Sequence, residues 1–171
     1  VGLLALVVAC GHNSGGSGSK VSATTWAKNV CTAIRPWAGQ IQTAVTDVQS
    51  TLAESSDPKV VKPQLTELFS GAATSTDKTI AKVDAAGVPD VSNGTKIAKD
   101  FRAALVSARD AFATANTSVA ALDTADKKKF DAAVSRVGTK LNQDNAKAGN
   151  NIHKATSAEL TAAFDKEPAC Q

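Results

Sequence analysis

The sequence predicts an all-α protein, an up-down-up-down four-helix bundle that follows a flexible N-terminal tether. From Ser22 onward, the apolar residues recur at intervals of three and four positions, as on one face of a helix, and they never alternate for long as in a strand. The chain has two Trp, five Phe and no Tyr, so its core volume must come from Ala, Val, Leu and Ile, which suits closely packed helices. Short connections between four apolar stretches favour antiparallel neighbours.

The first apolar stretch covers residues 26–52, and Pro36 lies inside it. A proline lacks the amide hydrogen that a helix interior uses, and its ring crowds the preceding turn. The residue before a proline is also biased away from helical backbone angles. We therefore expect a kink or a short break near Arg35.

The second stretch covers residues 61–83. Proline is favoured in the first turn of a helix, so Asp57-Pro58 and Lys62-Pro63 each offer a start for this helix. A glycine just past the last periodic residue, with a proline shortly after it, is typical of a helix end. Gly87 followed by Pro89 therefore predicts the stop.

The third stretch, residues 97–122, has the most regular spacing of the four, and Ser92 is the residue that we expect to cap its start. The fourth helix is expected to start after Asp123 or Thr124 and to end near Phe164. These four helices make residues 22–171 the folded domain.

Three cysteines leave one without a partner if the protein is exported, and Cys10, in the N-terminal region, is the natural odd one. Cys31 and Cys170 then form a pair that can close a disulfide in an oxidising compartment. In an up-down-up-down bundle the first helix starts at the end where the fourth helix finishes, so the topology also brings these two cysteines together. Such a crosslink contributes roughly 4–5 kcal/mol in the chain-entropy model.

The length of the fourth helix conflicts with this pairing. Read as one helix, residues 124–165 would extend about 60 Å, against about 35 Å for residues 31–54. Cys170 could not then return to Cys31 across the excess length. We therefore expect the fourth helix to bend or break, and Gly149-Asn150-Asn151 is the expected place.

The N-terminal segment differs in composition from the helical domain. Residues 1–9 are apolar or glycine and uncharged, too short for the ~20 residues of a membrane span but as long as the ~7–15-residue core of a signal peptide. Gly11 to Lys20 is rich in glycine and serine, which is typical of a flexible linker. We expect residues 1–9 to be a partial signal peptide that is removed, and residues 10–21 to form a tether.

The run Leu6-Val7-Val8-Ala9-Cys10 resembles the lipobox of bacterial lipoprotein precursors. The resemblance implies that Cys10 becomes the new amino terminus and carries a diacylglycerol, so the protein would be lipid-anchored to the cell membrane on its extracytoplasmic side. The charged segment and initiator Met of such precursors do not precede this run, so we expect a truncated or misplaced start. The alternative is a buried apolar segment with an incidental cysteine, which the glycine-serine run that follows disfavours.

A wider resemblance covers the whole chain. The lipobox, the glycine-serine linker, the spacing Trp26-x4-Cys31-x5-Trp37 and the ending Pro168-Ala169-Cys170 are similar to those of small secreted lipoproteins of actinobacteria. This resemblance implies an envelope location and a helical fold, and it implies no particular activity.

No motif points to catalysis or to a cofactor. His153 is the one histidine of the folded domain, and helical geometry places it away from the apolar face. The chain contains no Gly-x-Ser-x-Gly elbow, no Glu-x-x-His pair for a di-iron site, no Cys-x-x-Cys-His haem motif and no phosphate-binding glycine loop. A net charge of +3 does not favour nucleic-acid binding. We therefore expect a protein without enzymatic activity, metal or cofactor.

The most distinctive surface feature is a line of basic residues on the fourth helix, which we call the basic face. At 100° per residue its members fall within about 40° of one another; they are Lys129, Arg136, Lys140, Lys147 and Lys154. One interpretation is a surface for an anionic partner such as phospholipid head groups or a phosphate-bearing wall polymer. The other is an ordinary solvated face with its acids on neighbouring helices, which the mild net charge favours.

Asp144 and Asn145 interrupt the apolar face of the same helix. They could line a polar pocket in the core, although such a pair more often sets register or marks a bend.

The leading functional hypothesis is a non-enzymatic, membrane-tethered helical bundle that binds another envelope component or partner protein, or acts structurally. The alternative is a lipoprotein that holds a small molecule in a cavity between its helices. An enzyme of unrecognised type is a third hypothesis.

Overall fold

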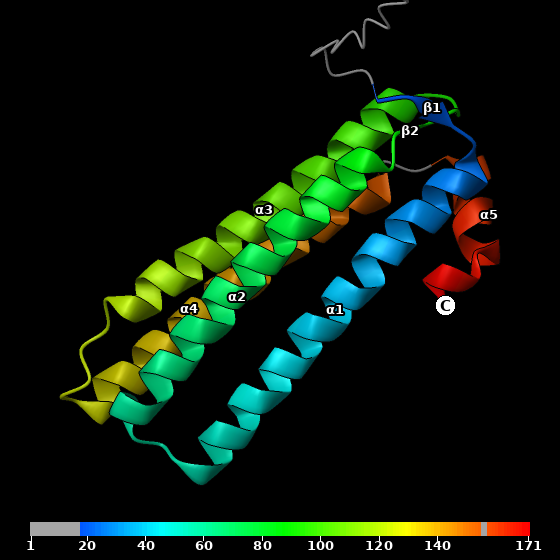
Figure 1. The fold of residues 1–171 in the computed structure, drawn as a ribbon. Coiled ribbons are helices and arrows are strands. Elements are labelled where there is room, and N and C mark those ends of the chain that lie inside the picture. The colour runs from blue at the N-terminus through cyan, green and yellow to red at the C-terminus, as the bar shows by residue number, and fades with distance from the viewer. Residues whose placement is uncertain (1–17, 155–156) are drawn as a thin grey trace, which may run out of the picture.

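A computed structural model of the protein describes residues 18–154 and 157–171, and it describes the side chains of residues 18–147 and 157–171 (Figure 1). The described chain consists of five α-helices, two strands of two residues each and a short 3₁₀ helix. The predicted all-α class is therefore confirmed.

Helix α1 (Ala23–Glu54) begins at Ser22, whose side chain accepts a hydrogen bond from the amide of Thr25. Of the two alternatives expected near Arg35, the short break is wrong, because α1 continues through Pro36, and the kink stays a prediction. Buried Ala33 precedes the proline and half-buried Trp37 follows it, and both pack against α2 and α3. This tertiary packing offsets the hydrogen bond that Pro36 cannot donate.

Helix α2 (Pro58–Ala85) starts at the first of the two expected positions. The carboxylate of Asp57 accepts a hydrogen bond from the amide of Lys59, and Pro58 occupies the first helical turn. Pro63 lies inside the helix. Gly87, with a φ of +82°, follows the end of α2 and confirms the predicted stop, since this backbone conformation favours glycine.

Strands β1 (Lys20–Val21) and β2 (Val88–Pro89) pair in parallel and join the start of the domain to the loop between α2 and α3. The tether was expected to be flexible through residue 21, but its last two residues belong to the folded domain.

Helix α3 (Gly94–Ala120) follows, and its cap is Asn93 with a φ of +60° rather than the expected Ser92. Gly94 has no room for a side chain, because a Cβ there would lie 1.8 Å from the carbonyl oxygen of Pro89.

Helix α4 (Lys127–Lys154) is followed by a second, short helix α5 (Ala158–Lys166) and the 3₁₀ helix η1 (Pro168–Cys170). A break at Gly149-Asn150-Asn151 is wrong, because α4 runs through these residues, and a bend there stays a prediction. Glycine and asparagine inside a helix cost at most about 1 kcal/mol each. Helix α5 begins after Ser157, whose hydroxyl accepts a hydrogen bond from the amide of Leu160.

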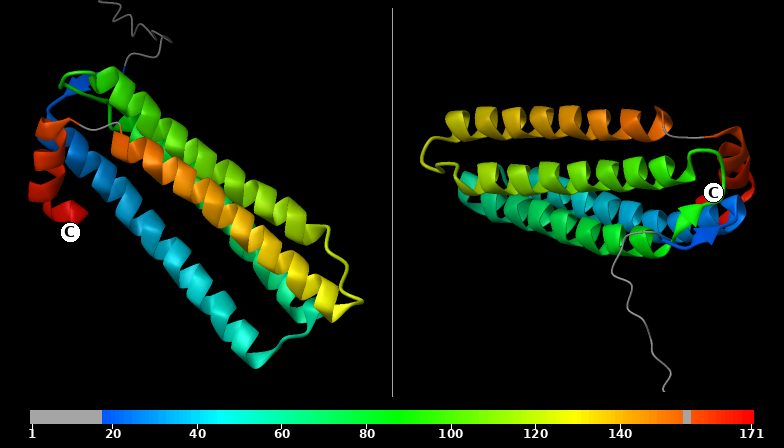
Figure 2. Two further views of the ribbon diagram at one scale, coloured as in Figure 1. Left: turned by 180° about the vertical axis from the view of Figure 1, so that it is seen from behind. Right: turned by 90° about the horizontal axis from the view of Figure 1, so that it is seen from above.

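The four long helices alternate in direction, but α1 and α4 do not close the array into a bundle. Helix α1 packs on α2, α2 on α3, and α3 on α4, while α5 and η1 pack on the first turns of α1. Figure 2 shows α4 in a layer of its own on one side of α3, with α1 and α2 on the other side. The helices therefore form an open array, and the closed four-helix bundle that the sequence predicts is not confirmed.

Three apolar clusters hold the described helices together, and one of them is the contact of Ala33 with Ile80, Val83 and Leu105 of α2 and α3. The central cluster takes residues from α1 to α4, including Val48, Phe69, Phe112 and Phe130. The second lies at the end where the chain enters and leaves the domain, around Trp26 and Leu160 of α1 and α5, which are 1% and 0% exposed. Among the described helices, none combines the length and the apolar character that crossing a membrane requires.

Candidate functional site

The structure contains the disulfide that the sequence predicts. Cys31, in the third turn of α1, forms a disulfide with Cys170 of η1, with their Cα atoms 5.0 Å apart. This crosslink fastens the C-terminal residues to the start of α1. Cys10, the expected lipidation site, lies outside the described residues.

An aromatic cluster that the sequence analysis missed lies beside this disulfide. Trp26 meets Phe101 of α3 and Phe164 of α5 edge to face, with ring centroids 5.6 and 5.8 Å away. Its indole nitrogen donates a hydrogen bond of 3.1 Å to the carbonyl oxygen of Gly87. The tether therefore enters the domain at an end that is held by strand pairing, aromatic packing and a covalent bond.

The basic face of α4 is exposed, and acidic residues of the chain neutralise part of it. Lys140 and Lys147 both pair with Asp144, which lies four positions after the first and three before the second. Lys129 pairs with Asp126 before the helix. Lys154, and His153 beside it, are among the residues whose side chains the structure leaves undescribed.

Arg136 differs from these lysines. Its side chain is exposed, and it has no ion-pair partner among the described residues. Lys128, in the first turn of α4, is also exposed, and it too has no ion-pair partner among the described residues. The structure therefore separates the basic face into paired lysines and an arginine available to a partner.

Asp144, which was expected to interrupt the apolar face, lies beside Val137 and Leu141 and also pairs with two lysines of the basic face. A hydrogen bond from Lys140 holds the pKa of its carboxyl below the ordinary value, with the charges of Lys140 and Lys147 adding to the effect and partial burial opposing it. The carboxylate remains ionised near neutral pH and orders the two lysines along one edge of the helix. The spacing of i,i+4 and i,i+3 could have identified this group from the sequence.

The helix concentrates positive charge. Seven of the nineteen basic residues of the chain lie in α4, but only two of its sixteen acidic residues do. The rest of the chain is therefore net acidic, and the mild overall charge hides a strong segregation. Such a distribution gives α4 a positive potential that opposite charges within the helix only partly cancel.

A pocket of about 170 Å³ opens between α3 and α4, next to the basic face. Its apolar lining includes Ala115, Val137 and Leu141, while Arg136 and Asp144 lie at its edge. Asn145, the other expected polar-pocket residue, does not line it, and the side-chain oxygen of Asn145 is buried without a hydrogen-bond partner among the described residues. The pocket therefore combines an apolar interior with a charged margin.

A larger groove of about 370 Å³ lies between α1 and α2. Ile41, Val48 and Leu68 contribute apolar surface, and the acidic Asp47 and Glu67 also line it. This groove opens where the second half of α1 lies beside the first half of α2.

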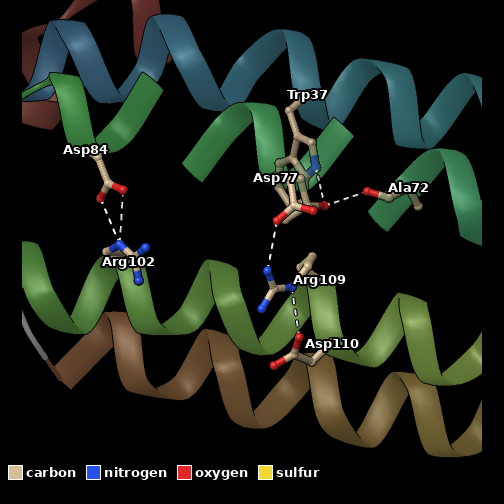
Figure 3. A network of polar contacts seen from close by, with 8 residues as sticks. Trp37, Ala72, Asp77, Asp84, Arg102, Arg109 and Asp110 are labelled. Carbon is tan, nitrogen blue, oxygen red and sulfur yellow. Dashed lines mark hydrogen bonds and ion pairs between the residues drawn. The ribbon is translucent and has the colours of Figure 1, made fainter. Parts of the chain in front are cut away.

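A polar network lies between α2 and α3 (Figure 3). Arg109 donates hydrogen bonds of 2.9 Å to Asp77 and 2.8 Å to Asp110, and Arg102 contacts both carboxylate oxygens of Asp84. The hydrogen bond to Asp110, followed by the one to Asp77, raises the pKa of Arg109 above its ordinary value. The pairs Arg109–Asp77 and Arg102–Asp84 join α2 to α3 along their exposed edge, and Arg109–Asp110 lies within α3.

Among the side chains that the structure describes, those of residues 18–147 and 157–171, no group of three or more histidine, cysteine or acidic residues is placed to hold a metal ion. Comparison with protein-family models, with curated proteins and with solved structures finds no significant match to this chain.

Proposed function

We propose that the protein is a non-enzymatic, extracytoplasmic lipoprotein, anchored to the cell membrane through a lipid on Cys10, whose helical array binds an anionic component of the envelope. The partner class is a phosphate-bearing wall polymer, an anionic phospholipid surface or an acidic surface of another envelope protein. Helix α4 supplies the binding surface, with Arg136 as its unpaired cation.

The segregation of charge carries this proposal. Helix α4 contains seven basic and two acidic residues in 28 positions, while the rest of the chain is net acidic. A solvated helix face that served only solubility would need no such imbalance, because interspersed charges of both signs suffice. Lys140 and Lys147 pair with the same carboxylate, which orients both cations along one edge of the helix and neutralises only one of their two positive charges.

The extracytoplasmic location is supported by the cysteines. The disulfide between Cys31 and Cys170 belongs to a compartment in which disulfides persist, which excludes most cytoplasmic proteins. The fold begins by residue 20, about ten residues after Cys10, so a lipid on Cys10 would sit on a short tether beside the disulfide end of the domain. Membrane attachment is tested by the variant Cys10→Ser, which should move the protein from the membrane fraction to the soluble fraction.

Binding is tested with the full chain carrying Cys10→Ser, so that no lipid contributes. We expect it to bind vesicles containing phosphatidylglycerol or a polyglycerol-phosphate polymer, and Lys140→Glu combined with Lys147→Glu should weaken binding roughly tenfold or more. Added salt should weaken binding as well.

The matched control is Lys78→Glu combined with Lys82→Glu. These two lysines are exposed on α2, lie one helical turn apart where Lys140 and Lys147 lie two turns apart, and change the net charge by the same amount. An equal loss in both double variants would show that only the net charge matters and would remove α4 as the binding surface.

A small-molecule-binding lipoprotein is the second candidate, and the groove between α1 and α2 favours it. Its 370 Å³ lies at the lower end of the ~300–1,000 Å³ range of ligand pockets. Gly71 lines the groove, and a Cβ there would meet nothing within 4 Å. Gly71→Leu should therefore fill the groove and abolish a ligand-induced rise in Tm that Gly39→Leu, at an equally open glycine outside it, leaves intact.

A further inference from the structure

The pocket between α3 and α4 has the size and lining of a site for a compact apolar group. Ala111 and Ala115 of α3 are 7% and 4% exposed, and Val137 and Leu141 of α4 face them across the pocket. Its volume of about 170 Å³ is close to the ~150 Å³ of an apolar cavity that accommodates benzene. The small side chains of α3 leave this space because no large residue stands opposite Val137 and Leu141.

The margin of the pocket offers hydrogen-bond donors. Arg136 stands on the α4 side, and its guanidinium presents a planar fork of N–H groups that matches a carboxylate or a phosphate. Thr114 and Ser118 stand on the α3 side, and neither hydroxyl donates a hydrogen bond to any residue that the structure describes. Their neighbour Thr117, in contrast, donates its hydroxyl to the carbonyl of Ala113.

The charge at the margin favours an anion. Asp144 is the acidic residue among those that line the pocket, and its carboxylate is engaged by Lys140 and Lys147. Together with Arg136, these side chains leave the margin with an excess of positive charge. An anion at Arg136 would therefore be attracted despite the nearby carboxylate.

We propose that this pocket binds an oxyanion joined to a compact apolar group, with the anion held by Arg136 and the hydroxyls of Thr114 and Ser118, and the apolar group between Ala115 and Leu141. The proposal rests on the proposed function, since it names the place on α4 where an anionic partner is recognised. The shared chemistry is a carboxylate or phosphate ester with an apolar group of about the size of a benzene ring. Its source is either a membrane lipid or a free molecule of the envelope.

Phenyl phosphate is the probe, added to the full chain with Cys10→Ser and followed by calorimetry. We expect phenyl phosphate to bind roughly tenfold or more tightly than inorganic phosphate or phenol, which each lack one half of the recognised group. Equal affinity for phenyl phosphate and inorganic phosphate would overturn the proposal, because the apolar pocket would then contribute nothing.

Arg136→Gln should weaken phenyl phosphate binding roughly tenfold or more. The matched control is Lys128→Gln, which removes one unpaired cation from the same exposed helix outside the pocket and should change binding by less than about twofold. Equal losses in the two variants would show a diffuse electrostatic effect and would overturn the site.

Ser118→Leu gives a second, independent test, because it fills the half-buried margin of the pocket without changing any charge. It should abolish phenyl phosphate binding and leave the helical circular dichroism unchanged. Unchanged affinity in this variant would contradict the proposed location.

The two proposals fail separately. If Lys140→Glu with Lys147→Glu abolishes polymer or vesicle binding while phenyl phosphate does not bind, the pocket is wrong and the proposed function stands. If phenyl phosphate binds through Arg136 while neither polymer nor vesicles bind, the pocket stands and the proposed function is wrong. A loss of vesicle binding in Ser118→Leu identifies the lipid as the source, and unchanged vesicle binding identifies a free molecule.

Discussion

The indole nitrogen of Trp37 donates a hydrogen bond of 2.9 Å to the hydroxyl oxygen of Thr76, linking α1 to α2 across the middle of the array (Figure 3). Thr76 is 0% exposed, and its hydroxyl in turn donates to the carbonyl oxygen of Ala72, 2.7 Å away. One buried hydroxyl thus satisfies the polar atom of the largest side chain at this contact. Since a buried N–H without an acceptor is costly, this pair fixes how α1 lies on α2.

We predict that Thr76→Val destabilises the fold by about 1–3 kcal/mol, because it keeps the shape of the side chain but leaves the indole N–H of Trp37 without its acceptor. Thr76→Ser should recover most of this loss. Urea denaturation followed by circular dichroism measures both. The control is Thr79→Val, at a residue that is 3% exposed and whose hydroxyl serves only the carbonyl of Ser75. Equal effects at positions 76 and 79 would contradict the role given to Trp37.

We predict that removal of the disulfide lowers the free energy of unfolding by about 2–5 kcal/mol, since Cys31 and Cys170 are 139 positions apart and the crosslink restricts a long loop of the unfolded chain. Denaturation with and without a thiol reductant measures this difference. The double variant Cys31→Ser with Cys170→Ser should match the reduced protein and should not respond to reductant. A wild-type midpoint that reductant leaves unchanged would contradict the prediction.

We predict opposite effects of alanine at two glycines. Gly94→Ala should destabilise the turn before α3, because the new Cβ would lie 1.8 Å from the carbonyl oxygen of Pro89 and the backbone would have to move. Gly138→Ala should stabilise the protein by about 0.5–1 kcal/mol, since nothing lies within 4 Å of the added carbon and alanine is the better helix former. Thermal melts of the two variants measure the signs, and a Gly94→Ala protein as stable as the wild type would refute the close approach.

We predict that the pKa of Asp144 rises toward its ordinary value in Lys140→Gln and rises less in Lys147→Gln, because the hydrogen bond from Lys140 is the largest cause of its lowering. Nuclear magnetic resonance of the side-chain carboxyl carbon follows this titration. The folded pKa is below the unfolded one, so ionised Asp144 stabilises the fold above its ordinary pKa, and this contribution is lost as the pH falls through the folded pKa. Equal shifts in the two variants would contradict the order of causes.

The sequence predicted the helical class and most helix ends because these depend on local chemistry. Apolar spacing, the cap at Asp57 and the stop at Gly87 act within a few residues. The break expected at Pro36 failed because packing of α1 against α2 and α3 offsets one missing hydrogen bond. Strands β1 and β2 were missed because two residues are too few to show alternation.

The candidate site was predicted in outline and missed in detail. The basic spacing on α4 located an exposed surface, but Asp144 was interpreted as a pocket, register or bend residue in the apolar face and not as the partner of Lys140 and Lys147. The pocket depends on which small residues of α3 stand opposite Val137 and Leu141, and that pairing is a tertiary relationship that no single helix displays. The hydrogen bond between Trp37 and Thr76 was not predicted for the same reason, because it joins two different helices.

The disulfide also sets how the molecule would carry mechanical load. If the described chain is pulled at its two ends, tension enters through β1 and the first turns of α1, crosses from Cys31 to Cys170, and leaves one residue later at Gln171. The second half of α1 and all of α2, α3 and α4 lie outside this path. A pull between these two ends would therefore strain a short segment and a covalent bond, while the surface that α4 presents would keep its shape under traction.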